Sequence, residues 1–389
     1  MIEGGAEART PLWRTRGMQA LVGVTLLGFA SYCLTLASLP TYAVTGGAAE
    51  STAGVVTAVF LAVTILVQLT VPALTARFGV GPVLIGGLVA MGVPSPFYVL
   101  DDGLAWISAL SAVRGGGFAV LTVLGATLAA QVAPPGRRGE SIGLYGLAIA
   151  VPNLVAVPAG VALVLDGHVG WLSWLAASPV LGALLVPRLV RSLGPQPGPG
   201  PAGTRRAVVA AAFLPSVVLF LVTLAGGGLV TFLPIERPDG VVATVALLLF
   251  GTTGAITRWR AGLLADRLGS RLLLPLALVA GAVGMLMTSV GFWTGDGWVL
   301  AGAALFGASY GATQNLTLLA AFARAGEGGT TTASAMWNIS FDAGTAVGAL
   351  GLGFLAAGIG LDWTYVVVAA SLAATVPLAS AAARSAVRV

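Results

Sequence analysis

Two ionisable side chains stand inside long apolar stretches of this 389-residue chain. Arg114 lies in an apolar run over 104–132, and Asp342 lies in another over 331–358. A charged side chain in hydrocarbon costs roughly 2.5–3.5 kcal/mol on insertion scales, so such residues usually face a cavity or a polar partner. A carboxylate there can take up and release a proton, whereas an arginine stays charged and acts on an anion or a nearby acid. We therefore expect Asp342 and Arg114 to serve proton coupling.

Polar side chains accompany these charges. Asn338 and Thr345 share the helical face of Asp342 by their spacing, and Trp337 is deep enough in the same run to stack on a substrate. The remaining candidate substrate-binding residues are Tyr310, Gln314 and Asn315 in 298–322, Thr35 in 17–43, and Tyr145 and Asn153 in 141–165. Polar side chains also join helices to one another in membranes. A structural arginine at 114 and a helix-bonding carboxylate at 342 therefore stay open as alternatives.

The elements that carry these residues are apolar helices. Apolar residues make up 57% of the chain and charged residues 8%, against about 25% charged residues in soluble domains. A run of roughly 20 such residues crosses a hydrocarbon core of about 30 Å. The chain predicts an all-α membrane protein with twelve transmembrane helices in two six-helix bundles. The expected spans are 17–43, 51–75, 80–99, 104–132, 141–165, 171–189, 207–234, 241–259, 272–293, 298–322, 331–358 and 364–383.

Charge and composition between the spans predict the orientation and the domains. Seventeen of the nineteen basic residues, all of them arginine, fall in the termini and alternate loops, and Arg237 alone falls in the opposite set. This pattern predicts a multi-pass protein of the cytoplasmic (cell) membrane with both termini in the cytoplasm. Residues 192–206 read SLGPQPGPGPAGTRR, a composition typical of a linker. We expect an N-terminal bundle over 1–191, this cytoplasmic linker, and a C-terminal bundle over 207–389.

One loop motif is specific. Gly262, Asp266, Arg267, Gly269 and Arg271 stand in GLLADRLGSR at the expected junction of the eighth and ninth spans. The segment resembles the loop signature of the major facilitator superfamily. Glycines there allow helix ends to approach, Asp266 can accept from a neighbouring helix N-terminus, and the arginines can pair across the loop. These five residues are expected to form a gating latch.

The resemblance extends over most of the chain. The matching stretch after the second span, 72–81, has Ala76 where the signature has an acid, so the C-terminal half is expected to carry more of the gating. The run 114–118 resembles an intramembrane arginine motif of the family, and Pro152 and Pro158 belong to a degenerate form of its exporter motif. Residues 337–345 resemble the drug and metabolite exporters. The resemblance implies a twelve-span drug or metabolite:proton antiporter.

Several function classes lack their residues. The chain has one histidine, one cysteine and no phosphate-binding Gly-Lys-Ser/Thr loop, so we expect neither an enzyme nor an ATP-driven pump, and no cofactor or metal. The expected function is proton-coupled efflux of a small, largely apolar or amphipathic molecule by alternating access. The alternatives are a proton-coupled importer of a small nutrient and a transporter-derived sensor. The expected partners are a small-molecule substrate, protons and the lipid bilayer, with no nucleic acid, and the protein is expected to be a monomer.

Overall fold

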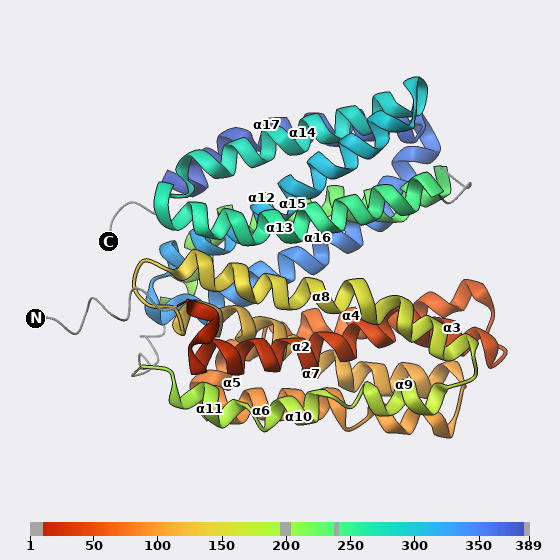
Figure 1. Cartoon of the computed structure of the whole chain (residues 1–389), viewed down its shortest axis with the longest axis vertical. Helices are drawn as coiled ribbons and strands as arrows, with labels where there is room; N and C mark the ends of the chain where they lie inside the picture. The colour runs from red at the N-terminus through yellow and green to blue at the C-terminus, as the bar shows by residue number, and fades with distance from the viewer. Residues whose placement is uncertain (1–10, 195–203, 237–240, 385–389) are drawn as a thin grey trace, which may run out of the picture. The chain divides into compact units, whose positions relative to one another are not determined.

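The computed structural model describes residues 11–194, 204–236 and 241–384 (Figure 1). Most of the expected linker 192–206, together with Arg237, lies outside these residues. Across the described ranges the chain is helical and contains no strand, which confirms the all-α fold class. Its first part comprises η1 Leu12–Arg14, α2 Arg16–Leu36, α3 Ser38–Thr45, α4 Glu50–Gln68, α5 Val71–Phe78, α6 Val80–Gly92, η2 Ser95–Leu100, α7 Leu104–Gln131, α8 Arg138–Leu165, α9 Val169–Leu175, α10 Pro179–Ala183 and α11 Val186–Arg191.

The second part has fewer and longer helices. They are α12 Thr204–Glu236, α13 Val241–Leu268, α14 Ser270–Thr294, α15 Asp296–Ala325, η3 Glu327–Gly329, α16 Thr330–Ile359 and α17 Leu361–Arg384. α13 runs on through Leu268, although its span was expected to end at 259. The loop motif therefore begins inside a helix.

Prolines explain where the expected first, second and sixth spans are interrupted. A proline ring clashes with the carbonyl four residues earlier and cannot donate to it. The helices α2, α4, α9 and α10 each end at the residue four positions before a proline, at Leu36, Gln68, Leu175 and Ala183. The axes of 54–68 and 71–78 differ in direction by 51°.

Ten helices of the described chain are long and apolar enough to cross a membrane, and the bent pair 54–68 and 71–78 makes an eleventh span if it is counted as one. The span expected at 298–322 corresponds to α15, which is long enough but stands outside this set. Gln314, Asn315 and several hydroxyl residues lower its hydropathy. The membrane fold is supported, and the count of twelve stays a prediction.

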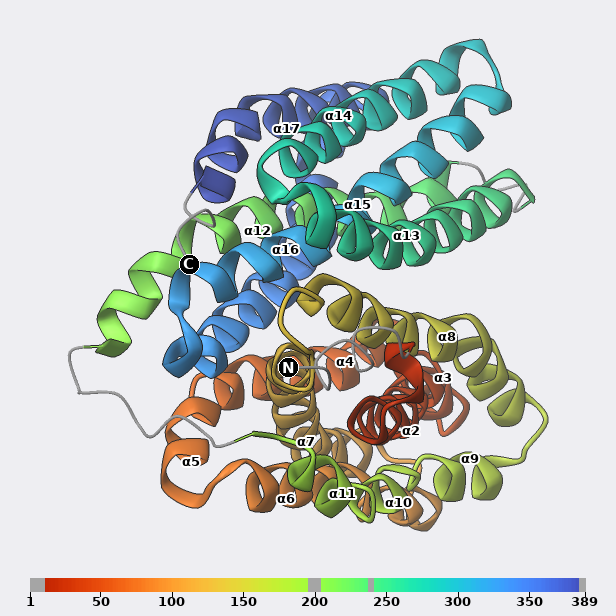
Figure 2. The same cartoon turned by 60° about the vertical axis from the view of Figure 1, so that its left-hand side comes forward.

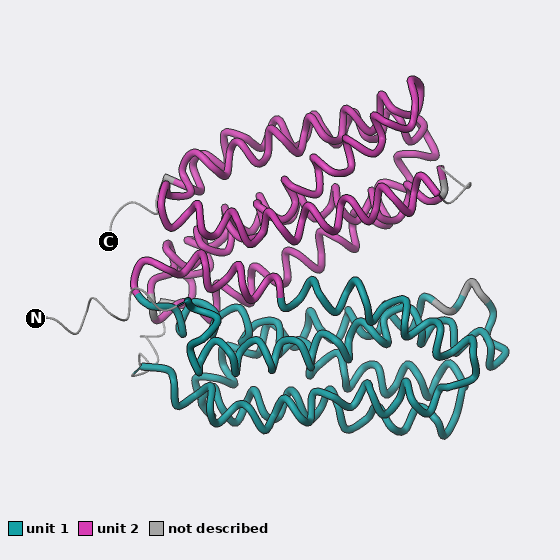
Figure 3. The backbone as a smooth tube through the Cα atoms, in the orientation of Figure 1, with its two compact units in different colours: residues 1–134, 148–199 teal, residues 135–147, 200–389 magenta. Residues whose placement is uncertain are grey.

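The helices group into two compact units (Figure 3). Unit 1 contains residues 1–134 and 148–199, and unit 2 contains residues 135–147 and 200–389. The helix α8 thus contributes its beginning, up to Leu147, to unit 2 and its remainder to unit 1. The boundaries expected from the linker do not include this exchange.

Close helix contacts at glycines build both units. In unit 1, α4 and α6 pack on α7, and a Cβ at Gly115 would collide with the Phe60 carbonyl of α4. In unit 2, α12 packs on α16, α13 and α14 pack on α15, and α14 lies beside α17 (Figures 1 and 2). There Gly311 faces the backbone of Gly254, and the Thr257 hydroxyl donates to the Ala308 carbonyl at 2.8 Å. Only small residues allow helices to come this close.

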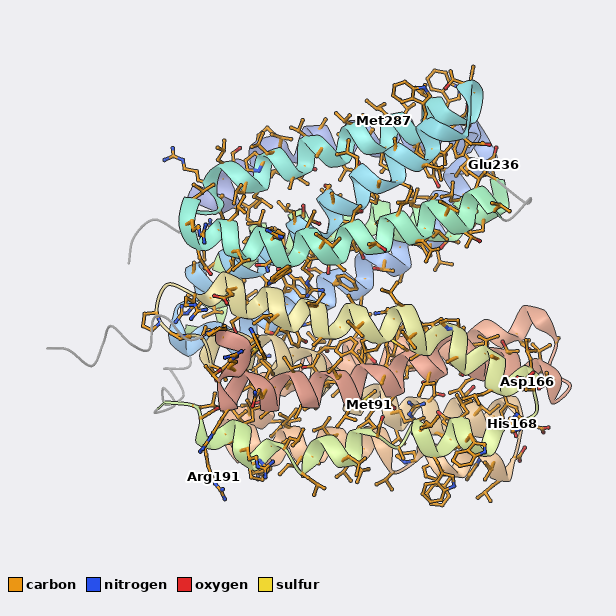
Figure 4. The ribbon with its side chains drawn as sticks, in the orientation of Figure 1. Met91, Asp166, His168, Arg191, Glu236 and Met287 are labelled. Atoms are coloured by element: carbon orange, nitrogen blue, oxygen red, sulfur yellow. The ribbon has the colours of Figure 1, made fainter. Side chains whose placement is uncertain are left out.

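The surface of each unit is rich in apolar side chains. Phe354 is 83% exposed and Leu184 is 73% exposed, and neither would be favourable in water. A lipid-facing surface accounts for them. Figure 4 shows Asp166 and His168 at one end of unit 1 and Arg191 at the opposite end, the separation of charge that the orientation prediction requires.

Candidate functional site

The interior of unit 2 contains a group of polar side chains, which we call the polar cluster. Four helices supply it: the beginning of α8, α13, α15 and α16. Its members are Tyr145, Arg258, Tyr310, Gln314, Asn315, Asp342 and Thr345. Of these, all but Arg258 were expected from the sequence, and the structure brings them together from segments far apart in the chain.

Arg258 lies at the centre of the polar cluster. Its side chain is only 8% exposed, and its Nη1 donates to the Gln314 amide oxygen at 2.8 Å. Its Nε is buried without a hydrogen-bond partner. Tyr145 and Tyr310 are its electrostatic neighbours. No carboxylate of the described residues forms an ion pair with it.

Packing between α13 and α15 fixes the position of Arg258. The close approach of Gly311 to Gly254 is followed one turn later by the Arg258–Gln314 hydrogen bond. The Asn315 amide nitrogen donates to the Arg258 carbonyl at 2.9 Å and to the Gly139 carbonyl of α8 at 3.4 Å. Contacts with α15 and α8 thereby fix this part of α13.

Tyr310 connects Arg258 with Asp342. Its hydroxyl has the Thr345 side chain as hydrogen-bond partner, and both Arg258 and Asp342 lie close enough to act on it electrostatically. Asp342 is partly buried in α16. Glycines of α12 make room, because a Cβ at Gly226 would collide with the Tyr310 ring. A carboxylic acid and an arginine thus both act on one phenol.

Aromatic rings border the polar cluster. Tyr310 contacts Phe250 with ring centroids 5.1 Å apart and Phe341 at 6.3 Å, and Phe341 stacks on Trp337 at 5.9 Å. The Trp337 indole N–H donates to the Thr317 hydroxyl at 3.0 Å, so its polar atom is satisfied inside unit 2. Asn338 is buried and donates to the Ser334 carbonyl of its own helix. The surroundings are therefore apolar and aromatic, with few polar groups.

The loop motif contacts the beginning of α8. Asp266 accepts hydrogen bonds from the backbone N–H groups of Gly139 and Glu140, each at 2.8 Å, as the sequence led us to expect of a carboxylate facing a helix N-terminus. Gly262 faces the Gly139 carbonyl so closely that a Cβ would not fit. These contacts hold residues 138–147 of α8 on α13.

The arginines of the loop motif behave differently. Arg267 and Arg271 are exposed and form no hydrogen bond or ion pair with any described residue, so the pairing that we expected across the loop is absent there. Gly269 adopts φ +75° and ends α13, and Gly79 adopts φ +84° at the corresponding place after α5. The turn geometry is common to both loops although Ala76 replaces the acid.

Arg114 belongs to unit 1 and is fully buried there. Its Nε donates to the Met91 carbonyl at 3.0 Å, its Nη1 to the Tyr98 hydroxyl at 3.2 Å, and its Nη2 to the Ser31 hydroxyl and carbonyl at 2.9 and 3.2 Å. All three nitrogens are satisfied by three other helical segments. This is the geometry of the structural alternative.

Thr35 and Asn153 also lie in unit 1, outside the polar cluster. The Thr35 hydroxyl donates to the Ser31 carbonyl of its own helix at 2.9 Å, and the side chain is buried. The Asn153 amide donates to the Ile149 carbonyl at 3.1 Å, and the side chain is exposed. The structure gives neither a contact with the other candidates.

Arg258 was missed because the sequence reading assigned it to the cytoplasmic arginines at the end of a span that was set to finish at 259. It lies well inside α13 instead. One signal could have found it: Gly254, Arg258 and Gly262 recur every four residues and so share one helical face. An arginine between two glycines on one face points toward a close neighbour, not toward water.

A cavity of about 680 Å³ lies elsewhere, at the arginine-rich end of unit 1. It is lined by Arg16, Gln19, Ala20, Leu185, Arg188, Arg191 and Ser192. Its arginines are exposed. The polar cluster, with its buried charge and aromatic border, is the better candidate for selective chemistry.

Comparison with known proteins gives the same architecture. A family model described as Major Facilitator Superfamily matches residues 20–349. Among solved structures, the fucose:proton symporter FucP of E. coli aligns with TM-score 0.72 at 14% identity over 94% of this chain and 98% of its own. The human organic anion transporter MFSD10 aligns with TM-score 0.74 at 16% identity, covering 95% of this chain and all of that chain. The proton:xylose symporter XylE aligns with TM-score 0.66 at 16% identity, covering 93% and 94%.

Proposed function

Because the chain belongs to the major facilitator superfamily, we propose that it is a secondary transporter that exports a small, largely apolar or amphipathic molecule in exchange for protons. The observation that carries this proposal is Asp342, a partly buried carboxylic acid in the apolar helix α16 that acts electrostatically on Tyr310. An acid in such surroundings can alternate between its protonated and ionised forms as the site opens to each side. That alternation couples a proton to the substrate.

The polar cluster supplies the substrate contacts in this proposal. Tyr310, Gln314, Asn315, Asn338, Thr345 and Tyr145 offer hydrogen bonds, and Trp337 and the neighbouring phenylalanines offer an apolar surface. Arg114 is assigned the structural alternative, since its donors are used within unit 1. Thr35 and Asn153 stay substrate-contact predictions from the sequence, and the structure gives them contacts only within their own helices.

Gating is assigned to the loop motif. Asp266 holds the beginning of α8 on α13 through two backbone N–H groups, and Gly262 allows that approach. Gly269 ends the helix, and Arg267 and Arg271 supply positive charge at the cytoplasmic face. Release of residues 138–147 from α13 would open the polar cluster toward that face.

The distribution of arginine supports a place in the cell membrane with both termini in the cytoplasm. The rival function is proton-coupled import of a small nutrient. Two of the aligned structures are named as proton symporters, of fucose and of xylose, and this favours keeping the rival. Proteoliposomes with an imposed proton gradient separate the two, because substrate moves with protons in a symporter and against them in an antiporter.

The acid is tested by Asp342→Asn. The amide keeps the size of the side chain and cannot ionise, so proton-driven flux should be lost while exchange of substrate across the membrane persists. A pH-sensitive dye inside the vesicles and efflux of preloaded substrate measure the two activities. Val347→Ala changes an exposed side chain of the same helix outside the polar cluster, so it serves as the control and should keep proton release. Full proton-driven flux in Asp342→Asn would remove the basis of the coupling assignment.

A further inference from the structure

Two buried arginines can be compared in this chain, one in each unit. Arg114 uses all three of its side-chain nitrogens within unit 1, where it makes four hydrogen bonds. Arg258 makes one hydrogen bond, through Nη1, and forms no ion pair with a described residue. Removing a guanidinium from water without compensating partners is costly. The partners that Arg114 finds inside the protein are missing at Arg258.

The vacant donors of Arg258 lie on one edge of the guanidinium. Nη1 donates to the Gln314 amide oxygen. Nε and Nη2 make no hydrogen bond with any described residue. These two nitrogens form the fork that binds both oxygens of a carboxylate in parallel. Of the two, Nε is buried, and it lies against α8.

Gly146 is the residue of α8 that faces this edge. A Cβ built at Gly146 would come closer than 3.0 Å to the Arg258 Nε, and its next contacts would be the Cδ at 2.7 Å and the Cγ at 3.1 Å of the same side chain. Since glycine offers no side chain, the Arg258 Nε meets only backbone there. Departure of residues 138–147 from α13 would uncover this nitrogen.

The neighbours of Arg258 add further donors. The Gln314 amide nitrogen makes no hydrogen bond with the described chain, and the hydroxyls of Tyr145 and Tyr310 act on Arg258 electrostatically. Aromatic rings continue from Tyr310 to Phe250 on one side and to Phe341 on the other. The group thus combines a positive fork, neutral donors and an apolar border.

We propose that Arg258 is the counter-charge for an anionic group of the substrate, and that the substrate class is an amphipathic organic carboxylate. This inference rests on the proposed transport function and narrows it, because it assigns the substrate a charge. The Gln314 amide and the two tyrosines add hydrogen bonds, and the rings cover the apolar body. The beginning of α8 shields the fork when the anion is absent.

Binding to the purified full-length protein tests the inference without any need for flux. The probes are octanoate, benzoate and naphthoate, each compared with its neutral amide, and inorganic phosphate as an anion without an apolar body. Isothermal titration should show tighter binding of at least one carboxylate than of its amide. Arg258→Gln should weaken that carboxylate about 10- to 100-fold, as expected for a charge-assisted hydrogen bond, and leave the amide unchanged. Arg258→Lys should fall between the two, since it keeps the charge and loses the fork.

Two glycine variants separate a binding role from a packing role. Gly146→Ala places a methyl group on the fork and should weaken carboxylate binding although Arg258 is intact. Gly143→Ala, one turn earlier on the same face, meets the Trp259 backbone at 3.0 Å and should leave the carboxylate preference unchanged. Melting of the unliganded variants verifies that each is folded. If Arg258→Gln does not fold, Arg258→Lys and Gly146→Ala still decide the question.

Several results would overturn the inference: no carboxylate preferred over its amide by the wild type, the same preference in Arg258→Gln, or equal competition by inorganic phosphate. The transport proposal fails on a different result. Carboxylate binding that depends on Arg258, without proton-coupled flux in liposomes, would leave the site and remove the antiporter. Proton-coupled flux of a neutral molecule, unchanged in Arg258→Gln, would do the reverse.

Discussion

Replacement of Arg114 by methionine tests whether that arginine holds unit 1 together or serves the substrate. Methionine keeps much of the length and none of the donors. The Met91 and Ser31 carbonyls lose the guanidinium hydrogen bonds, and so do the Tyr98 and Ser31 hydroxyls. The substitution therefore removes links between four segments of unit 1.

The structure sets the size of the effect. Each hydrogen bond between helices of a membrane protein contributes roughly 0.6–1.7 kcal/mol, and Arg114 makes four. Methionine avoids the free-energy cost of burying a charged guanidinium, which offsets part of this loss. A decrease of about 2–4 kcal/mol in the free energy of unfolding is therefore expected. Tyr98→Phe removes one of the four partners and also the hydrogen bond to the Ser111 hydroxyl at 3.0 Å, and should cost about 1 kcal/mol. In the double variant the total loss should be less than the sum, because Tyr98 has already lost its Arg114 partner and only the Ser111 bond remains to be lost.

Unfolding in detergent by denaturant or heat, followed by tryptophan fluorescence, measures these losses. Transport per folded molecule is measured in the same preparations. Stability equal to that of the wild type, with substrate binding abolished, would refute the structural role and restore Arg114 as a substrate or coupling residue. Additive losses in the double variant would also contradict the geometry.

Two further predictions concern unit 2. Asp266→Ala removes two hydrogen bonds to the first turn of α8, an interaction worth roughly 0.3–1 kcal/mol at an exposed helix end. In a Cys33→Ser background, the rate of thiol labelling at an engineered Ser141→Cys should therefore rise about 2- to 5-fold. An unchanged labelling rate would exclude the latch. Gly311→Ala of α15 forces a methyl group into the Gly254 carbonyl of α13 and should cost about 1–3 kcal/mol of stability. Gly251→Ala should be neutral, because a Cβ at this position of α13 would have nothing within 4 Å. Equal melting temperatures of both variants would show that α13 and α15 tolerate separation.

Hydropathy and helical period predicted much of unit 2 because both depend on local sequence. The face shared by Asn338, Asp342 and Thr345 and the polar run at Tyr310 to Asn315 followed from spacing alone. Tyr145 joins the others in the structure because the beginning of α8 packs on α13. That pairing depends on Gly139 and Gly262 fitting together, and no single segment of sequence contains it.

The two arginines show what sequence could not supply. Both stand in apolar surroundings, and only the partners distinguish them. Arg114 is satisfied by carbonyls and hydroxyls whose positions depend on the packing of α2, α6 and η2, which sequence does not give. Arg258 was hidden by an error in a helix end, since a span that finishes at 259 puts the residue at the water interface. Helix ends are the least certain part of such predictions.

The divided helix α8 has a consequence for work with fragments. A cut in the linker 192–206 would appear to release two complete halves. A C-terminal fragment produced in this way lacks residues 135–147, which cover Gly262, Trp259 and Arg258 in the whole chain. In this fragment the Arg258 guanidinium and the adjoining backbone of α13 would lose the residues that cover them. The fragment should therefore accumulate only when the N-terminal fragment, or a peptide that supplies those thirteen residues, is made in the same cell.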